Sequence, residues 1–288
     1  MKIVIIGLGY SAGFFARAAQ IAGHSVLGTV RSAEKARRLT QQGLPTLVFD
    51  GLVVSDALDA AIREAEAALV STQPSGAVDP ALACLGAALA AAPMLRWIGY
   101  LSTIGVYGDH GGAWIDESAE CHGSSDRAST RLAIDEAWLA FGRATGKPVH
   151  IFRLSGIYGP GRNAIVNLRE GTARRLIKPG QVFNRIHAED IAGVLLASLE
   201  RPRAGAIYNV SDDEPAPPQD VVSFAADLIG VPPPPEIPYD PTQLSPMAAS
   251  FYSQNKRVSN ALVKRELGYV YRYPTYREAL TALAAAGE

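Results

Sequence analysis

The chain contains 288 residues, of which 48% are hydrophobic and 19% are charged, so it can bury a sizeable core and need not be disordered. Its formal net charge is −1, and it has no long run of Lys and Arg. This balance argues against the clustered basic surface on which binding to nucleic acids and anionic membranes depends, and we expect neither partner.

Cys84 and Cys121 are the only cysteines. They lack the Cys-x-x-Cys spacing of zinc and redox sites, so we expect no metal and no disulfide framework. Gly7 interrupts the N-terminal apolar segment well short of the length that a signal peptide or a membrane span requires. We therefore expect a cytoplasmic protein.

Short apolar segments alternate with helical patterns over the first half of the chain. The expected strands are Lys2–Ile6, Ser25–Val30, Thr46–Phe49, Ala68–Ser71, Leu95–Leu101 and Val149–Leu154. The expected helices are Gly13–Ala22, Ala33–Gln42, Asp56–Ala67, Pro80–Ala92 and Ser129–Thr145. This alternation predicts an α/β fold, a doubly wound parallel Rossmann sheet with helices on both faces and right-handed crossovers.

Proline-rich segments divide the chain after Gly159 into shorter pieces. The expected elements here are helices at about Ala164–Leu176, Asp190–Leu199, Pro218–Ile229, Asn260–Leu267 and Tyr276–Ala285, and a strand at Ile207–Val210. We interpret this part as a smaller C-terminal substrate lobe that is interleaved with the end of the main sheet. The predicted division is residues 1–160 with parts of 182–212 for the Rossmann domain, and 161–181 with 213–288 for the lobe.

A glycine-rich loop connects the first strand to the first helix. It reads Gly7-Leu8-Gly9-Tyr10-Ser11-Ala12-Gly13. Gly7 permits the tight turn, Gly9 lets the backbone approach a pyrophosphate, and Ala12 or Gly13 lets the helix pack closely on the strand. Free N–H groups at the helix N-terminus then face the phosphates. The loop therefore predicts a dinucleotide site that is formed by Gly7, Gly9, Tyr10, Ser11 and Ala12.

The second strand ends without the acidic residue that accepts a hydrogen bond from the ribose 2′-OH of NAD. Arg31 and Ser32 occupy this place, and a guanidinium and a hydroxyl suit a 2′-phosphate. Lys35, Arg37 and Arg38 either add positive potential or form a solvated basic face. We therefore predict NADP rather than NAD as the cofactor.

Polar residues also follow the third and fourth strands. Asp50 either reaches the adenine or caps a turn with Gly51, while Ser71 and Thr72 lie beside the expected crevice. We predict all three polar residues to be cofactor ligands. Asp79, which precedes Pro80, is best interpreted as a helix N-cap.

Four segments follow one another in the order of a known family. They are Leu101–Asp109, Phe152–Gly161, Arg185–Ala192 and Tyr208–Pro215. These segments resemble the extended short-chain dehydrogenases/reductases, the NAD-dependent epimerase/dehydratase group, over nearly the whole chain. By this resemblance Thr103 is the residue that polarises the substrate. Likewise, the turn of Ser155, Gly156 and Ile157 lies along the nicotinamide.

The resemblance fails at the Tyr-x-x-x-Lys pair of that group. Arg127 stands where the proton-carrying Tyr is expected, and Arg131 stands where the ribose-binding Lys is expected. Arg131 can still hold ribose hydroxyls or phosphate, but a guanidinium with a pKa above about 12 does not carry protons near neutral pH. We therefore expect an atypical member of the family. A literal Tyr-x-x-x-Lys at Tyr252 and Lys256 lies too far downstream and is interpreted as a coincidence.

Other groups lie close in sequence to the strand ends and are weaker candidates for carrying a proton. They are Tyr107, Tyr158, His110, His122 and Asp126. Tyr107 is the one that we retain as a candidate catalytic residue, although packing is the simpler role for both tyrosines. Solvent exposure is the simpler expectation for both histidines.

Arg162 and Arg185 flank the expected substrate cleft, and we predict that they bind a carboxylate or phosphate of a small substrate. An ion pair at the surface or between the lobes is an equal alternative for each. His187 is expected to pack between the lobes.

Two functions fit these residues. The first is an atypical NADP-dependent oxidoreductase or epimerase-like enzyme, and the second is a non-catalytic NADP-sensing module. Arg31 and the missing Tyr disfavour an ordinary NAD-dependent sugar-nucleotide epimerase. The family resemblance also suggests a homodimer that forms through the helices at Pro80–Ala92 and Ser129–Thr145.

Overall fold

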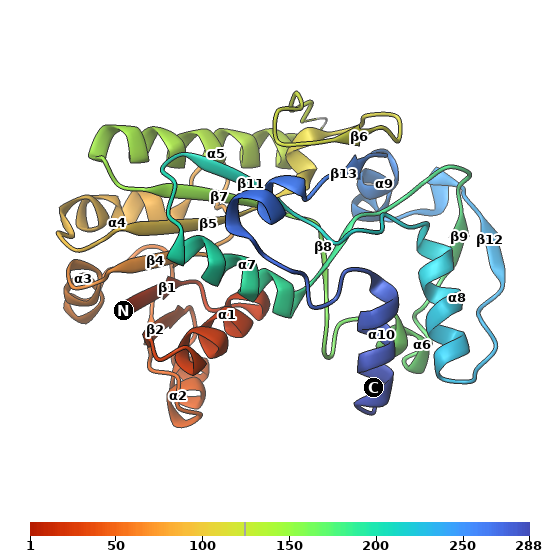
Figure 1. Ribbon diagram of the computed structural model, residues 1–288, viewed down its shortest axis with the longest axis horizontal. Coiled ribbons are helices and arrows are strands. Elements are labelled where there is room, and N and C mark those ends of the chain that lie inside the picture. The colour runs from red at the N-terminus through yellow and green to blue at the C-terminus, as the bar shows by residue number, and fades with distance from the viewer. Residues whose placement is uncertain (124) are drawn as a thin grey trace.

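The computed structural model describes residues 1–123 and 125–288, and a seven-stranded parallel sheet lies at its centre (Figure 1). The strand order is β11-β7-β5-β4-β1-β2-β3. The strands are β1 (Lys2–Ile6), β2 (Ser25–Val30), β3 (Thr46–Val48), β4 (Ala67–Val70), β5 (Trp97–Thr103), β7 (Val149–Leu154) and β11 (Ala206–Val210). The central strands are continuous buried runs rather than alternating patterns, because both faces of the sheet are covered.

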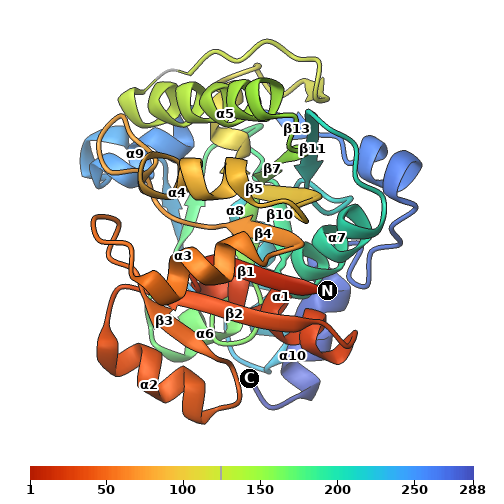
Figure 2. The same cartoon turned by 90° about the vertical axis from the view of Figure 1, so that its left-hand side faces the viewer.

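Two layers of helices cover the sheet (Figure 2). One face carries α1 (Tyr10–Ile21), α2 (Ala33–Gln41) and α7 (Ala188–Glu200). The opposite face carries α3 (Asp56–Arg63), α4 (Pro80–Ala91) and α5 (Asp126–Thr145). Trp97 on β5 is buried beneath the first layer, and Trp138 on α5 is buried in the second. The predicted doubly wound Rossmann fold is confirmed.

The direction of the chain across the sheet reverses between β1 and β4. These strands pair with each other, although the chain runs from β1 outward through β2 and β3 before it returns to β4. In open α/β sheets, ligands bind beyond the carboxyl ends of the strands at such a reversal. The loops that follow β1 and β4 therefore border the expected cofactor crevice.

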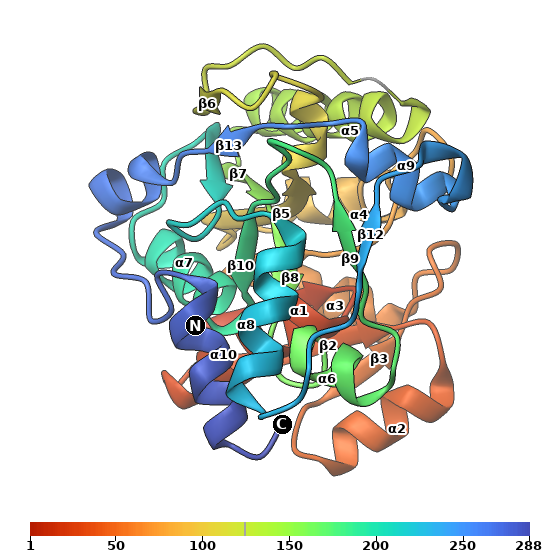
Figure 3. The same ribbon diagram turned by 90° about the vertical axis from the view of Figure 1, so that its right-hand side faces the viewer.

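A smaller group of elements faces the viewer in Figure 3. Its helices α6 (Ala164–Arg169), α8 (Pro218–Leu228) and α10 (Tyr276–Ala285) share a separate apolar cluster. Two small parallel pairs lie beside them: β8 (Gly156–Tyr158) with β10 (Arg185–His187), and β9 (Arg175–Ile177) with β12 (Glu236–Pro238). The remaining elements are η1 (Ile104–Tyr107), β6 (Trp114–Ile115), η2 (Pro241–Gln243), α9 (Pro246–Tyr252), β13 (Arg257–Val258) and η3 (Val263–Leu267).

One expected helix in this group is wrong in its length. The pattern at 164–176 predicts a single helix, but α6 ends at Arg169, and Gly171 follows with φ of +66°. Arg175–Ile177 instead forms β9, whose partner β12 lies about 60 residues downstream. Pairings of two or three residues, such as β6 with β13, have no periodicity of their own and were not predicted.

The last part of the chain returns to the main sheet after α9. Val263, Leu267 and Tyr271 are buried in the cluster that also contains α7 and β11. Residues 263–271 therefore pack against the Rossmann sheet, whereas α10 belongs to the smaller apolar cluster. Within the described residues, no helix is both long and apolar enough to cross a membrane.

Candidate functional site

Gly7 lies where β1 meets the end of β4. Its φ is +92°, and a Cβ atom at this position would come within 2.9 Å of the carbonyl carbon of Ser71. Its N–H donates a 2.9 Å hydrogen bond to Thr29 Oγ1 on β2. No side chain larger than hydrogen fits this turn, so the loop stays close to the end of β4.

The N-terminus of α1 is open for a ligand. Gly9 caps the helix without any side-chain acceptor, and a Cβ atom on it would contact nothing within 4 Å. The amides of the first turn therefore face free space, as a phosphate site requires. Ala12 is 0% exposed against the sheet, whereas a Cβ on Gly13 would meet nothing within 4 Å. Close packing thus requires a small residue at Ala12 and not at Gly13.

Tyr10 and Ser11 are the first two residues of α1. Ser11 is buried, while the Tyr10 hydroxyl donates a 2.9 Å hydrogen bond to the Pro160 carbonyl. Arg162 lies over the Tyr10 ring at 5.8 Å, and burial raises the pKa of Tyr10 to about 12. Tyr10 therefore joins the glycine loop to the segment that leads into the smaller lobe, and it brings the exposed Arg162 to that loop.

Positive groups gather where β2 ends. Arg31 is exposed and forms no ion pair with any described residue. Ser32 caps α2 by accepting a 3.3 Å hydrogen bond from the Lys35 N–H, which leaves its own hydroxyl proton free. The Lys35 ammonium donates to the Leu8 carbonyl at 3.2 Å, so this cation lies over the glycine loop. Arg37 and Arg38 are exposed on the same helix.

Asp50 caps a turn, as the second of its two expected roles requires. Its Oδ1 accepts hydrogen bonds from the N–H groups of Leu52 and Val53 at 2.9 and 3.1 Å. These two bonds lower the pKa of the carboxyl group. The exposed Oδ2 atom is left for any contact with a ligand.

Thr72, which follows β4, contacts Asp79, although the sequence analysis gave the two residues unrelated roles. Thr72 Oγ1 donates to Asp79 Oδ2 at 3.3 Å, and Asp79 Oδ1 caps α4 by accepting from Leu82 N at 2.9 Å. The N-cap role of Asp79 is confirmed. Burial raises the pKa of this carboxyl group, which is 3% exposed. Ser71 donates its N–H to the Ile6 carbonyl at 2.8 Å, which ties the loop after β4 to β1.

Thr103 ends β5 with its hydroxyl proton available. Its Oγ1 accepts a 3.1 Å hydrogen bond from the Gly105 N–H and thereby caps η1. Since a threonine hydroxyl is both acceptor and donor, this contact leaves the O–H free to donate to a substrate oxygen. The side chain is half-buried, so a ligand can reach it.

Arg131 lies beside the same strand end. One of its terminal nitrogens donates to the Leu101 carbonyl at 2.6 Å, and its guanidinium lies 5.4 Å from the centre of the Tyr100 ring. Its Nε is buried without a partner among the described residues. Arg127, one turn earlier on α5, is exposed and has no ion pair in the described part of the chain. Only Arg131 is therefore held against the strand that ends at Thr103.

Tyr107 belongs to a buried polar network. It is 0% exposed, its hydroxyl donates to Asn209 Oδ1 at 2.8 Å, and Arg153 lies over its ring at 4.8 Å. Burial raises the pKa of Tyr107 to about 12. This geometry favours packing over proton transfer.

The sequence reasoning missed the centre of that network. Asp135 accepts a 2.5 Å hydrogen bond from Ser102 Oγ and pairs with Arg153 at 3.2 Å. Asp135 lies on α5 one turn after Arg131, and Ser102 directly precedes Thr103. No local pattern marks this contact, because the charged partners lie on different elements 18 residues apart.

The turn after β7 is held from two sides. Ser155 donates its N–H to the Val210 carbonyl, and Gly156 donates its N–H to the Asn184 carbonyl, both at 3.0 Å. A Cβ atom on Gly156 would lie 3.1 Å from that carbonyl oxygen. The Ser155 hydroxyl is buried without a partner among the described residues, while Gly156 is exposed and Ile157 half-buried. The turn thus presents backbone to the crevice.

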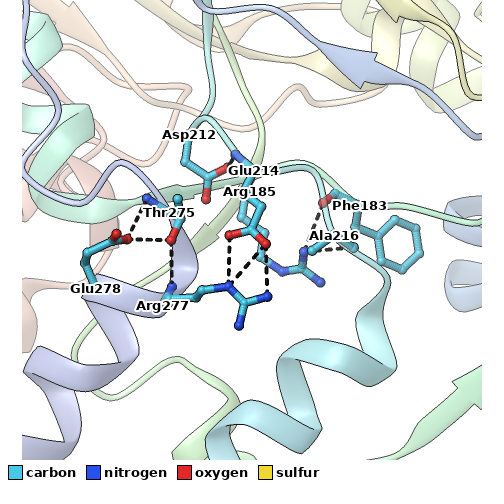
Figure 4. A network of polar contacts seen from close by, with 8 residues as sticks. All are labelled: Phe183, Arg185, Asp212, Glu214, Ala216, Thr275, Arg277 and Glu278. Atoms are coloured by element: carbon cyan, nitrogen blue, oxygen red, sulfur yellow. Dashed lines mark hydrogen bonds and ion pairs between the residues drawn. The ribbon is translucent and has the colours of Figure 1, made fainter.

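Arg185 lies at the start of β10, beside the smaller lobe, and Figure 4 shows its surroundings. Its guanidinium donates to the carbonyls of Phe183 and Ala216 at 2.9 and 3.1 Å and has no carboxylate within 4.0 Å in the described chain. Glu214 is instead engaged by Arg277 at 3.1 Å. Burial lowers the pKa of Arg185. A guanidinium in this state is a candidate receptor for an anion.

The buried Asp212 carboxylate near Arg185 also lacks one partner. Its Oδ1 accepts from the Glu214 N–H at 3.3 Å, and its Oδ2 has none among the described residues. Burial raises the pKa of Asp212 well above its usual range. Arg185 therefore keeps a positive potential that Asp212 does not fully cancel.

The histidines have the expected roles in part. His187 is 1% exposed, lies between the rings of Tyr158 and Tyr273 at 5.3 and 4.3 Å, and has its pKa lowered by burial to about 4. It therefore packs at the junction of the lobes, as expected. The ring centres of His110 and His122 are 5.2 Å apart, and His122 is exposed whereas His110 is half-buried.

Fold, glycine loop and strand-end residues together define an NAD(P)-binding Rossmann protein. The model of the NAD-dependent epimerase/dehydratase family matches residues 3–211, and the chain belongs to this family. Protein YeeZ of Escherichia coli (strain K12) is 27% identical over 95% of this chain and 96% of its own. The solved structure of a functionally unknown conserved protein from Silicibacter pomeroyi DSS is 46% identical and covers 99% of both chains, with a TM-score of 0.89.

More distant structures share the fold alone. The structure of dTDP-glucose 4,6-dehydratase from Bacillus anthracis in complex with NAD is 17% identical, covers 100% of this chain and 97% of its own, and has a TM-score of 0.80. The predicted resemblance to the epimerase/dehydratase group is thus confirmed. The choice between NADP and NAD, and the role of each site residue, stay predictions.

Proposed function

We propose that this chain is an atypical NADP-dependent oxidoreductase or epimerase-like enzyme that acts on a small anionic molecule. The observation that carries the cofactor choice is Arg31, an exposed guanidinium at the end of β2 where NAD-binding units have an acid. Ser32, with its free hydroxyl proton, caps the next helix, and the Lys35 ammonium from that helix reaches the glycine loop. Three donors of this kind fit a 2′-phosphate, and a carboxylate would repel it.

The remaining loops fit the rest of the dinucleotide. Gly7 leaves no room for a Cβ, and Gly9 leaves the N-terminus of α1 open, so a pyrophosphate can reach the amides of Tyr10 to Ala12. Asp50, Ser71 and Thr72 would line the adenosine end, and Ser155 to Ile157 would line the nicotinamide end. Bound NADPH would supply a hydride, and NADP would accept one.

Thr103 and Arg131 support chemistry at a carbonyl or hydroxyl. The free Thr103 O–H would donate to the substrate oxygen, and the Arg131 charge would stabilise negative charge that develops there. A guanidinium is not a proton carrier in proteins, and the Tyr107 hydroxyl is occupied by Asn209. The proton would therefore be exchanged with water, which replaces the missing Tyr.

Arg185 and Arg162 support an anionic substrate. Arg185 has no close carboxylate and is held by carbonyl oxygens, so its remaining N–H groups suit a carboxylate or phosphate. Arg162 would bind the same class of group from the other side of the segment between the lobes. We further propose a cytoplasmic homodimer formed through α4 and α5, for which light scattering should give twice the mass of the chain.

A calorimetric titration with NADPH, NADP, NADH and NAD tests the cofactor choice. We expect tighter binding of the phosphorylated pair, and a loss of about tenfold to a hundredfold in Arg31→Ala, the effect of one charge-assisted contact. Arg96→Ala is the matched control, since Arg96 pairs with Glu66 at the amino ends of β5 and β4, away from the carboxyl ends that border the crevice. Equal binding of all four nucleotides would refute the NADP assignment.

A non-catalytic NADP sensor is the second candidate, and Arg127 in place of the family Tyr favours it. A sensor would bind NADPH tightly, and the hydrogen exchange of its smaller lobe would change on binding. It would not transfer the hydride of NADPH to any carbonyl compound. Oxidation of NADPH by any carbonyl compound, lost in Thr103→Ala, would exclude this candidate.

A further inference from the structure

A short segment, Gln254–Val258, which we call the strap, contacts two segments that border the candidate site. On one side it pairs with the loop after η1. Asn255 N donates to Asp109 Oδ1 at 2.6 Å, and the Asn255 carbonyl accepts from the N–H groups of His110 and Gly112 at 3.0 Å. Arg257–Val258 (β13) continues this contact by pairing with β6.

On its other side the strap contacts the chain that leads into β10. Gln181 Nε2 donates to the Gln254 carbonyl at 2.8 Å. Asn184 donates to the Lys256 carbonyl at 2.9 Å and accepts from Val258 N at 2.8 Å. The Asn184 carbonyl also accepts from Gly156, the residue expected beside the nicotinamide. The strap therefore connects the loop after β5 with both the Gly156 turn and the strand that begins at Arg185.

Lys256 carries the contact of the strap with the residue that follows η1. It is 5% exposed, and its ammonium donates to the Gly108 carbonyl at 2.6 Å and to Gln254 Oε1 at 2.9 Å. Gly108 is the C-cap of η1, and Thr103 is its N-cap. Lys256 has no carboxylate within 4.0 Å among the described residues, and the charged group that acts on it is Asp109, which is bonded to Asn255.

Burying this ammonium is costly, and a neutral residue would fill the same space at less cost. Burial accordingly lowers the pKa of Lys256 to about 8. The ammonium points to Gly108 and Gln254, while the Tyr252 carbonyl accepts a hydrogen bond from Lys178. Tyr252 and Lys256 thus form no catalytic pair, and a different reason is needed for a buried lysine at this point.

We propose that Lys256 is a positioning residue: it fixes the end of η1 to the strap and so holds Thr103 and the Gly156 turn at a set separation around the nicotinamide. The inference takes NADP as the ligand from the proposed function, and it takes the positions of Thr103 and the Gly156 turn from the hydrogen bonds of the strap. The adenosine end of the cofactor site, at Arg31 and Asp50, shares no contact with the strap in the described chain.

The test compares two ligands, NADP and 2′-phospho-ADP-ribose, which lacks the nicotinamide. Lys256→Met should weaken NADP binding about tenfold and change the binding of 2′-phospho-ADP-ribose less than about twofold. Lys256→Arg, which keeps an N–H donor and the charge, should restore part of the loss. Lys147→Met is the matched control, because Lys147 also donates to a main-chain carbonyl, that of Ala92, ahead of the amino ends of β7 and β5.

The positioning role would be overturned if Lys256→Met weakened the binding of both ligands equally, or if it weakened the binding of neither. If the unaltered protein binds neither ligand, the proposed function fails, and hydrogen exchange of the free protein decides the inference. Lys256→Met should then raise hydrogen exchange in residues 104–113 and 180–187, and Lys147→Met should raise it in neither segment. Unchanged exchange in Lys256→Met would show that Lys256 does not hold these two segments together. Should Lys256→Met not fold, Gln254→Leu removes one of the two acceptors, and about a twofold effect in the same direction is expected.

Discussion

The carboxylate of Asp135 lies 3.2 Å from Arg153 Nε in the interior, where the two side chains are 0% and 4% exposed. Asp135 also accepts the Ser102 hydroxyl at 2.5 Å. These contacts join α5 and β7 to β5 one residue before Thr103, and Arg131 is on the same helix one turn earlier. The buried pair therefore sets where α5 lies relative to the end of β5.

Asp135→Asn should strongly destabilise the protein, because it leaves the Arg153 charge buried without an anion. We expect the free energy of unfolding to fall by about 3–5 kcal/mol in urea denaturation. Asp59→Asn provides the control, since Asp59 and Arg63 form an exposed pair on α3 whose loss should change stability little. Similar effects of the two substitutions would show that the buried charge is otherwise compensated.

Arg131 and Arg127 should differ in their effect on the cofactor. Arg131 is held against the Leu101 carbonyl beside Thr103, while Arg127 is exposed. Arg131→Met should weaken NADPH binding about tenfold, and Arg127→Ala should leave it within about twofold. Calorimetry on the two variants measures both values, and a larger loss in Arg127→Ala would mean that the first turn of α5 faces the cofactor.

The parts of the site that depend on neighbouring residues could be predicted from the sequence. Gly7 and Gly9 act through the backbone of their own turn, and Asp79 caps the helix that starts one residue later. The doubly wound sheet followed from buried strands that alternate with helices. Such features require no knowledge of which distant segments meet.

Contacts between distant segments could not be predicted. The contacts of Asp135 with Arg153, of Asn184 with Lys256 and of Lys256 with Gly108 join residues 18, 72 and 148 positions apart, and only the folded sheet and lobe bring them together. The same cause explains the helix expected at 164–176, because the pairing of β9 with β12 overrides the local helical pattern. The sequence reasoning noticed Lys256 only through a Tyr-x-x-x-Lys spacing that the structure does not use.

Arg31→Asp should shift the cofactor preference toward NAD. The carboxylate would repel the 2′-phosphate and could accept a hydrogen bond from a 2′-OH. We expect NADPH binding to weaken about a hundredfold and NADH binding to improve, as calorimetric titrations of both nucleotides would measure. Unchanged NADPH affinity would place the 2′-phosphate elsewhere, for example on Lys35 alone.

Lys256 should give the protein a measurable dependence of stability on pH. In the unfolded chain a lysine keeps its proton up to about pH 10.5, whereas the pKa of Lys256 in the folded protein is about 8. Between these values the unfolded state binds more protons, so the free energy of unfolding rises with pH. The full difference corresponds to about 3 kcal/mol, which is present above about pH 10.5 and lost as the pH falls toward 8.

Lys256→Met should abolish that rise while it leaves the contribution of every other group in place. Denaturation in urea at about pH 7.5 and about pH 10 gives the free energy of unfolding of both proteins. The difference between the unaltered protein and Lys256→Met should change by about 2–3 kcal/mol over this interval. The buried tyrosines titrate alike in both proteins and cancel in the comparison. A constant difference would mean that the Lys256 ammonium is as well solvated in the folded protein as in the unfolded chain, and the argument for a costly buried charge at Gly108 would fail.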